Sequence, residues 1–238
     1  MTIPILGCIR TRCALHPRTK AVFLETEDEG KTMKRLLATA VAAAALAASV
    51  ASAEQRALSG FTRVAASAGT NVEVVAGPAF SVEVTGRDAE RIVTRVSGDL
   101  LIVEPRRSLS WRGPRDARVR VTMPRIEGLS AASGADVRAS GVDSATIALA
   151  SSSGADLRVS GRCGAFTADA SSGSDIRADE LRCESGRVDV SSGADVRVYA
   201  SGRLDVDASS GGGVVAYGDP GLGDIDLSSG GSVRRASR

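Results

Sequence analysis

The sequence predicts an all-β fold, namely a β-solenoid (β-helix) of about six coils of 19–20 residues with an N-terminal cap of β-strands. Three observations support this prediction. A short motif recurs at nearly constant spacing, apolar residues alternate with polar ones inside each repeat, and aromatic residues make up only 3% of the 238 residues. Alternation with a period of two is typical of strands with one buried face. Small side chains suit a narrow core between facing sheets, which large rings would force apart.

The repeated motif is Ser-Gly, then a small residue, Asp, an apolar residue and Arg. Its four complete and two degenerate copies begin at Ser133, Ser153, Ser172, Ser192, Ser210 and Ser229. The motif glycines follow one another at steps of 20, 19, 20, 18 and 19 residues. A short, constant, all-β period is typical of coils stacked on their neighbours, with a Ser-Gly corner between the two strands of each unit. The alternative, an antiparallel sandwich, would not need identical residues at equal offsets.

The region before the repeats has a different pattern. Residues 54–130 are expected to form the N-terminal β region of the domain, and residues 131–238 are expected to form its solenoid repeats. Strands are predicted at residues 61–66, 71–76, 79–85, 92–97, 99–104 and 118–124, with a helical turn at 87–90. Because one coil cannot hide its own apolar face, we expect these strands to cover the first coil.

Residues 33–53 have the composition of a secretory signal peptide. A short basic start precedes an apolar run, which ends in the small-residue cleavage site Ala51-Ser52-Ala53. We therefore expect cleavage between Ala53 and Glu54, and a location in the periplasm, on the cell surface or outside the cell. An uncleaved membrane anchor is the alternative, but the run is short and rich in alanine.

Residues 1–32 precede this signal and show no apolar periodicity. The simplest interpretation is a start codon assigned too early, so that Met33 begins the protein and 1–32 is a disordered extension. Cys8, Cys13 and His16 have the side chains of metal ligands. We predict no metal site there, because ligands in an unstructured leader have no fixed geometry.

The chain from Glu54 onward contains no histidine and no lysine. Ser-His-Asp and Cys-His catalysis and histidine-ligated metals are therefore excluded, and we expect no enzyme activity, no catalytic residue and no cofactor. The net charge of +2, with 24% charged residues, argues against nucleic-acid binding driven by bulk charge. The scarcity of aromatic residues disfavours a deep ligand pocket walled by rings.

The repeats place charged residues in outward columns. One column is Asp136, Asp156, Asp175 and Asp195, and the adjoining one is Arg138, Arg158, Arg177 and Arg197. We expect each Asp to pair with an Arg along or across the coils, on a solvated face. A second acidic column, with no regular Arg companion, is Asp169, Asp189, Asp207 and Asp226. The alternative is that this column binds calcium, because calcium prefers clustered carboxylates. The GGxGxD repeats of calcium-binding β-helices are absent, so no metal site is predicted.

The segment from Pro105 to Arg118 is the candidate ligand-binding loop. Its arginines surround the only tryptophan of the chain, and the candidate residues are Arg106, Arg107, Trp111, Arg112 and Arg115. Arginine forks suit phosphate or carboxylate, and a tryptophan can stack on a sugar or a guanidinium. We expect an anionic envelope polysaccharide or another envelope protein as the partner. The alternative is that the tryptophan caps the solenoid core while the arginines are solvated.

A disulfide is predicted between Cys163 and Cys183, the only cysteines after the signal peptide. They lie twenty residues apart, close to one repeat, so they fall near the same offset on adjacent coils. The rung spacing of about 4.8 Å is compatible with a disulfide, and export leads to an oxidising compartment. Two buried free thiols are the alternative, because the two offsets from the motif glycine differ by one residue.

The order of motifs resembles the autotransporter-adhesin head GIN domain family of bacterial envelope proteins. The resemblance covers residues 58–236 and is carried by VEVVAGPAFSVEVTG at 72–86, LLIVEP at 100–105 and VRVTMPRIEGL at 119–129, followed by Ser-Gly-Ala-Asp units. It implies a secreted β-helical domain without established enzymatic activity, and it supplies no catalytic motif.

These observations together predict an exported, non-enzymatic β-solenoid that acts as an adhesin-like binding or surface-structural module of the bacterial cell envelope. We expect no membrane span after signal cleavage. The alternative is a carbohydrate-active β-helix enzyme of the polysaccharide lyase type acting on anionic glycan. Such an enzyme would need arginine as its base and calcium bound by aspartate.

Overall fold

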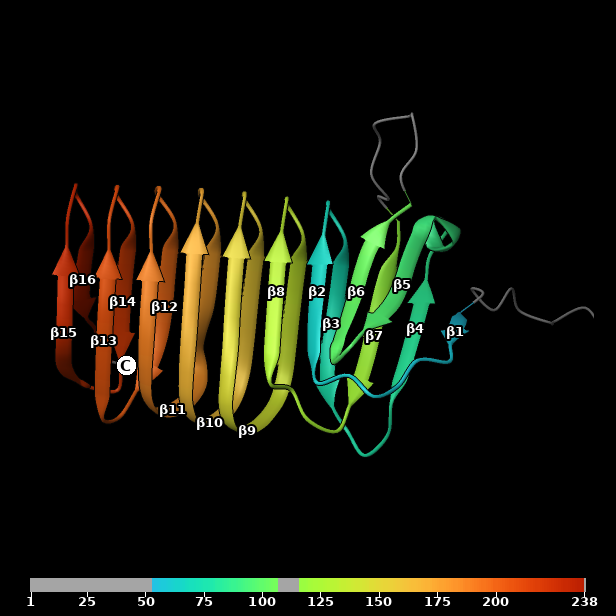
Figure 1. The fold of residues 1–238 in the computed structure, drawn as a ribbon, viewed down its shortest axis with the longest axis horizontal. Helices are drawn as coiled ribbons and strands as arrows, with labels where there is room; N and C mark the ends of the chain where they lie inside the picture. Colours follow the sequence, from blue (N-terminus) through green and yellow to red (C-terminus); the bar gives the residue numbers. More distant parts are fainter. Residues whose placement is uncertain (1–52, 107–115, 238) are drawn as a thin grey trace, which may run out of the picture. The chain divides into compact units, whose positions relative to one another are not determined.

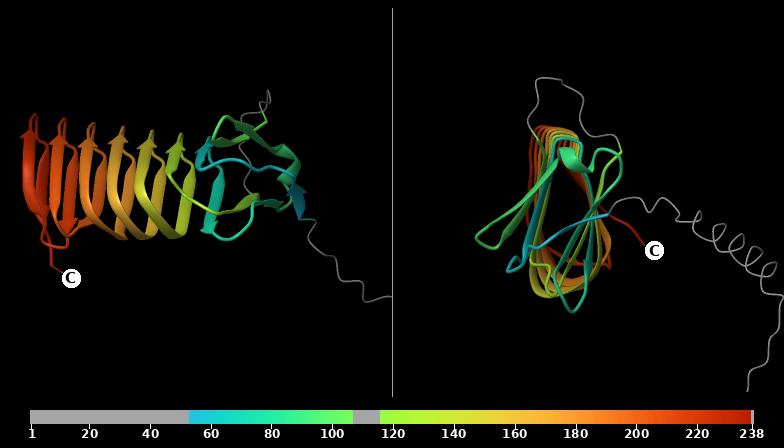
Figure 2. Two further views of the ribbon diagram at one scale, coloured as in Figure 1. Left: turned by 60° about the horizontal axis from the view of Figure 1, so that its bottom comes forward. Right: turned by 90° about the vertical axis from the view of Figure 1, so that its right-hand side faces the viewer.

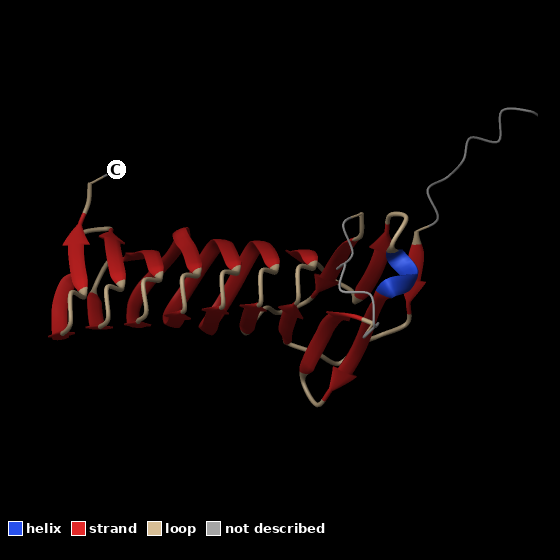
Figure 3. Cartoon of the chain, turned by 90° about the horizontal axis from the view of Figure 1, so that it is seen from above, coloured by secondary structure: helices blue, strands red, loops and turns tan. Residues whose placement is uncertain are grey.

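A computed structural model of the chain describes residues 53–106 and 116–237. These residues form stacked β-coils, as the repeats predict (Figure 1). Their only helical element is the single turn η1 (Ala89–Arg91) (Figure 3). The leader and most of the predicted signal peptide, residues 1–52, lie outside the described residues.

The strands before the repeats are short. They are β1 (Glu54–Arg56), β2 (Arg63–Ser67), β3 (Asn71–Ala76), β4 (Ser81–Thr85), β5 (Ile92–Ser97), β6 (Leu100–Pro105), β7 (Arg118–Met123) and β8 (Gly128–Ala132). The predicted strands at 61–66, 71–76, 79–85, 92–97, 99–104 and 118–124 correspond to β2 to β7 within one or two residues. The sequence did not predict β1 and β8.

The strands of the repeats begin with three long ones that each run around most of a coil. They are β9 (Asp136–Ser152), β10 (Asp156–Ser171), β11 (Asp175–Val190), β12 (Asp195–Ala200), β13 (Arg203–Ala208), β14 (Gly213–Tyr217), β15 (Gly221–Leu227) and β16 (Ser232–Arg235). The six Ser-Gly corners enclose five complete turns, one fewer than the six coils expected. The count differs because each complete turn runs from one corner to the next, so six corners bound five turns.

Two facing sheets result from this winding. Sheet 1 has the order β1-β4-β7-β3-β9-β10-β11-β12-β14-β16. Sheet 2 has the order β5-β6-β2-β8-β9-β10-β11-β13-β15, and β9 to β11 bend so that each contributes to both sheets. Pairing within the repeats is parallel and in register, so that Asp156 lies between Asp136 and Asp175. Figure 2 shows the stack from the side and along its axis.

The Ser-Gly corners have a backbone conformation that explains their composition. Both residues of each corner have positive φ, for example 53° at Ser133 and 72° at Gly134. The N–H of Ala135 donates to the carbonyl of Ala132 at 3.2 Å, which closes a tight turn. Two consecutive residues with positive φ are typical of type I′ turns, where glycine is favoured at the second position because it has no Cβ.

A ladder of hydrogen bonds joins each corner to the next. The N–H of Gly134 donates to the carbonyl of Ser153, and that of Gly154 to Ser172, each at 3.1 Å. The same bond continues through the remaining corners to Ser229. The corner backbone is therefore part of the parallel ladder, which requires the corners to recur at one position in every coil.

The core consists of small aliphatic side chains stacked in columns. On sheet 1 one column, joined rung by rung, is Val84, Val119, Val72, Val137, Leu157, Ile176, Val196, Val214 and Val233. All of its members except Val233 are buried. The facing column on sheet 2 contains Leu129, Leu149, Ala168, Val188 and Val206, which are also buried. The alternating pattern of the sequence thus marks the inward side chains.

The N-terminal region extends the solenoid as well as capping it. β2 and β3 form a coil that lies between the β6/β7 layer and the β8/β9 layer, and all of these pairings are parallel. Only β1, β4 and β5 pair antiparallel, at the end of the stack. The predicted N-terminal cap of β-strands is therefore confirmed, and β1, β4 and β5 form it. The structure adds a coil that the sequence did not predict, because β2 and β3 are inserted out of sequence order.

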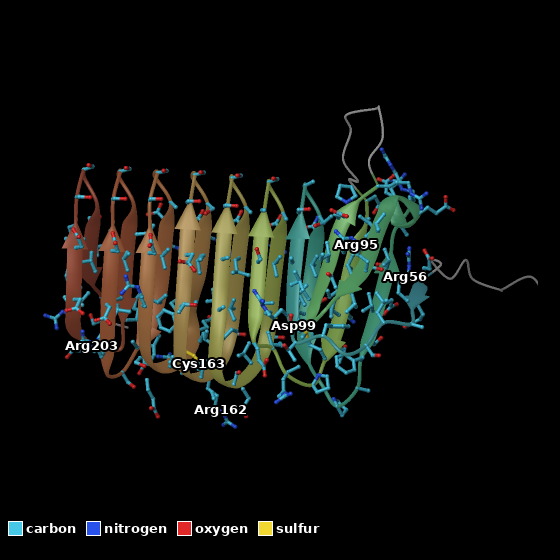
Figure 4. The ribbon with its side chains drawn as sticks, viewed as in Figure 1. Arg56, Arg95, Asp99, Arg162, Cys163 and Arg203 are labelled. Carbon is cyan, nitrogen blue, oxygen red and sulfur yellow. A yellow bond between two sulfur atoms is a disulfide. The ribbon has the colours of Figure 1, made fainter. Side chains whose placement is uncertain are left out.

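The predicted disulfide is present. Cys163 and Cys183 are bonded, with a Cα–Cα distance of 4.5 Å, at the end of the coils opposite the Ser-Gly corners (Figure 4). The two residues are direct partners across β10 and β11. The one-residue difference in their offsets is absorbed by a register shift between Arg158 and Ser160, so the side chains meet.

Reduction of this disulfide is expected to lower the free energy of unfolding by about 3 kcal/mol, because the bridge closes a loop of roughly twenty residues in the unfolded chain. Denaturant unfolding with and without reductant measures the change. The double variant Cys163→Ser/Cys183→Ser is the control and should not respond to reductant. Equal midpoints for the parent protein under both conditions would contradict the prediction.

Candidate functional site

A shallow groove of about 830 Å³ crosses the outer face of sheet 1 near its N-terminal end. Strands β3, β4 and β7 form one side, and the first two repeat coils, in β9 and β10, form the other. Its polar lining includes Arg118, Arg120, Arg138, Arg158, Glu73 and Glu180. The groove is lined by outward side chains of in-register rungs, and along one line these are Glu83, Arg120, Glu73, Arg138 and Arg158, at the rung spacing of about 4.8 Å.

Three arginines of the groove form no ion pair within the described part of the chain. They are Arg118, Arg138 and Arg158, and all three are exposed. By contrast, Arg120 binds Glu73 at 3.0 Å. The carboxylate of Asp116, at the edge of the groove, accepts a 2.6 Å bond from Arg87. Within the described residues, the groove therefore contains guanidinium groups that have no carboxylate partner, next to acidic groups that are partly neutralised.

A smaller hollow of about 170 Å³ continues along the same face over Arg138, Arg158 and Arg177. Arg177 lies 4.0 Å from Asp156 and 3.8 Å from Asp175. It is the only member of the predicted arginine column that pairs with the aspartate column among the described residues. The expectation that each Asp pairs with an Arg is therefore confirmed for Asp156 and Asp175 and wrong for Asp136 and Asp195. In-register stacking puts like residues side by side, and an exposed arginine gains little by bending across to the next column.

The predicted ligand loop is mostly outside the described residues. Of its candidates only Arg106 is described; it is exposed, and its backbone N–H donates to the carbonyl of Arg91 at 2.6 Å. The other candidates, Arg107, Trp111, Arg112 and Arg115, lie in the segment 107–115 that the structure does not describe. The residues directly after that segment, Asp116 and Arg118, line the groove.

The groove itself was missed by sequence reasoning. The columns of Arg138 and Arg158 were recognised, but they were interpreted as a solvated face. No sequence signal shows that β3 and β7 lie beside these columns, because that contact depends on the out-of-order insertion of the β2–β3 coil.

The second acidic column lies on the outer face of sheet 2. Asp169, Asp189, Asp207 and Asp226 are direct partners on successive rungs. Partial burial and the neighbouring Asp189 raise the pKa of Asp169, against an opposing effect of Arg187. Within residues 53–106 and 116–237, no three His, Cys, Asp or Glu side chains are grouped so as to hold a metal ion.

The pKa values of two other carboxylates of the repeats are shifted in the opposite direction, downward. The backbone N–H of Asp224 and the guanidinium of Arg203 lower the pKa of Asp205. Arg203, labelled in Figure 4, donates to Asp205 at 2.9 Å and to Asp224 at 3.0 Å. A hydrogen bond from Arg162 likewise lowers the pKa of Asp143. These contacts stabilise the ionised forms of Asp205 and Asp143. Partial burial and the neighbouring Asp189 instead destabilise the ionised form of Asp169.

Replacement of the destabilised carboxylate, Asp169→Asn, should stabilise the protein at pH 7 by less than about 1 kcal/mol. A raised folded pKa means that ionisation weakens the folded state, so this cost appears as the pH rises through the pKa of Asp169. The gain should therefore vanish near pH 3, where the carboxyl is protonated in both states. Denaturant unfolding at the two pH values measures it.

The control for this prediction is Asp143→Asn, for which we expect a change in stability of the opposite sign. Because Arg162 lowers the pKa of Asp143, its ionised form stabilises the fold, and the variant should be less stable than the parent at pH 7. A pH-independent difference for Asp169→Asn would show that ionisation of this partly buried carboxyl beside Asp189 is not the cause.

The described residues contain no helix long and apolar enough to cross a membrane. The fold and the groove define a class, the β-solenoid domains that present a repetitive charged face. Within this class the chain belongs to the family described as putative auto-transporter adhesin, head GIN domain, whose model matches residues 60–220. None of the curated proteins matches the chain.

One solved structure shares the fold, and others resemble it less closely. A putative adhesin from Bacteroides fragilis matches with a TM-score of 0.60 and 14% identity, over 79% of this chain and 96% of its own. A putative lipid binding protein from Parabacteroides distasonis matches with a TM-score of 0.45 and 14% identity, over 78% and 96%. A putative adhesin from the same organism has a TM-score of 0.44 and 12% identity, over 78% and 96%. At these identities the likeness concerns the fold alone.

Proposed function

We propose that the protein is an exported, non-enzymatic, adhesin-like binding module of the bacterial envelope, and that it binds an anionic polysaccharide along the outer face of sheet 1. Membership of the adhesin head family supports a binding or structural role. The observation that carries the choice of ligand is the set of arginines in the groove, Arg118, Arg138 and Arg158, which form no ion pair within the described residues.

The spacing of these groups suits a linear polymer. Arg138 and Arg158 lie on adjacent rungs, separated by about 4.8 Å, which is comparable to the length of one sugar unit. Each guanidinium can bind a carboxylate or sulfate through two parallel N–H donors. An extended glycan with one acidic group per sugar would therefore place successive charges over successive arginines.

The acidic groups of the groove add selectivity. Glu73 and Glu83 lie on the same line of rungs as Arg138, with Arg120 between them, so they repel an anion that extends past Arg138 toward the N-terminal end of the stack. Glu180 lies beside the arginines and repels an anion that is displaced sideways from them. Close like charges make wrong partners costly, so a binding face of mixed charge selects for register as well as for charge. A polymer with charges at a different spacing should bind more weakly than one that matches the rungs.

The double variant Arg138→Ala/Arg158→Ala should weaken binding to polygalacturonate on the order of tenfold or more, because two charge-assisted contacts are lost. Isothermal titration at low and high salt measures the effect, and added salt should weaken parent binding. Neutral dextran is the ligand control. Arg187→Ala, an exposed arginine on sheet 2, is the matched protein control and should bind as the parent does.

Equal binding of the parent and the groove variant would contradict this site. The sequence-based proposal for the loop is tested in parallel with Arg112→Ala/Arg115→Ala, which should also weaken binding. The same incubations with and without calcium address the enzymatic alternative. Polygalacturonate of unchanged length supports the binding module, whereas shortened chains would favour a lyase-type activity.

Export is tested at the N-terminus. If residues 33–53 are a cleaved signal peptide, N-terminal sequencing of the protein recovered from the envelope or medium should begin at Glu54. Replacement of Ala51 and Ala53 by bulky residues should retain the precursor. Residues 1–32 on the exported protein would show that both the start-site and the cleavage predictions are wrong.

A further inference from the structure

The last coil of the stack, formed by β15 and β16, exposes apolar side chains that every preceding coil buries. Leu222, Ile225 and Leu227 are 40%, 37% and 44% exposed, and they are the only large apolar side chains of the described chain that are exposed to this degree. Their partners one rung earlier, Val206 and Ala208, are 2% and 1% exposed. The solenoid core therefore opens to water at this end.

The backbone of this coil is also unpartnered on one side. β15 pairs only with β13, and β16 only with β14, among the described strands. Ser228 donates its N–H to Ala208 and Ser232 donates to Gly212, so the alternate N–H groups, such as those of Leu227 and Val233, point away from the stack. Two exposed strand edges side by side, with an apolar strip between them, form a template for further pairing.

The opposite end of the stack is built differently. There β1, β4 and β5 run antiparallel to their neighbours and close the coil. A second copy added head to tail would therefore meet a cap and not an equivalent coil. Two open ends, in contrast, can meet each other about a two-fold axis, which gives a closed dimer.

Two such arrangements bring the open coils together, and both make the new strand pairs antiparallel. If the two-fold axis runs along the strands, β15 of one copy pairs with β16 of the other. If it runs across the two sheets, β15 meets β15 and β16 meets β16. The outward side chains differ in charge, because β15 carries Asp224 and Asp226 and β16 carries Arg234. The first arrangement puts opposite charges beside each other at both junctions, and the second puts like charges together.

We propose that the protein forms a two-fold dimer through its last coil, with β15 of each copy pairing with β16 of the other. This pairing satisfies both open edges and covers the apolar strip of Leu222, Ile225 and Leu227. Both sheets then continue through the junction, and the two groove-bearing ends point away from each other. Because the joined surface is a single coil, we expect a weak dimer, with a dissociation constant on the order of micromolar.

Sedimentation velocity of the protein, expressed from its full coding sequence, should show a monomer–dimer equilibrium between micromolar and hundreds of micromolar concentrations. Asp226→Arg and Arg234→Asp should each weaken the dimer on the order of tenfold, since both junctions change from attraction to repulsion. The double variant Asp226→Arg/Arg234→Asp should restore it, because the opposite charges are exchanged and not lost. Arg187→Ala is the control for a charge change away from the junction.

Amide hydrogen exchange provides the second measurement, and it needs no variant. The outward N–H groups of Leu227 and Val233 should exchange more slowly at high protein concentration than at low concentration. A monomer at all concentrations, or a dimer that neither single variant weakens, would overturn the proposal. A double variant as weak as the single ones would overturn the pairing of β15 with β16.

Discussion

The in-register parallel pairing of one coil with the next is the interaction on which the rest of the structure depends. It stacks Val137, Leu157 and Ile176 into one apolar column, and it stacks the Ser-Gly corners into a continuous ladder of Gly N–H to Ser carbonyl bonds. Without a compensating register shift, a coil one residue longer would turn every following side chain to the wrong face. The chain tolerates its 18- to 20-residue steps because the excess is absorbed in register shifts at the end opposite the corners.

The same register that builds the core also imposes the electrostatics of the surface. Stacking identical repeats places aspartate beside aspartate and arginine beside arginine, so like charges adjoin along each face. On sheet 2 partial burial, and then the stacked neighbour Asp189, raise the pKa of Asp169. On sheet 1 the register places Arg138 and Arg158 side by side, and neither has a carboxylate partner in the described chain. The repetitive fold thus combines a simple core with surface arginines that lack a carboxylate partner. A repetitive anionic ligand could bind to these arginines.

The two ends of the stack have different consequences. Antiparallel strands close the N-terminal end and, with β3 and β7, bring Arg118 and Arg120 to the edge of the groove. No described strand covers the last coil, and its apolar side chains and strand edges face water. The proposed binding site and the proposed dimer surface therefore lie at opposite ends of one stack. A dimer joined at its open ends would present two grooves, which would strengthen attachment to a polymer through multivalency.

The sequence by itself determined the repeat, the inward columns, the corner glycines and the pairing of Cys163 with Cys183, because each depends on local periodicity. It did not determine the position of the β2–β3 coil between later strands, since nothing in a local pattern records which distant strand is a neighbour. The groove follows from that insertion, so only the tertiary structure located it. The ion pairs were likewise decided in three dimensions, because Arg138, Arg158 and Arg177 have the same place in the repeat and only Arg177 reaches two carboxylates. The register of the strands determines on which face of the sheet a side chain lies. The contacts of a long, exposed side chain depend in addition on how that side chain bends.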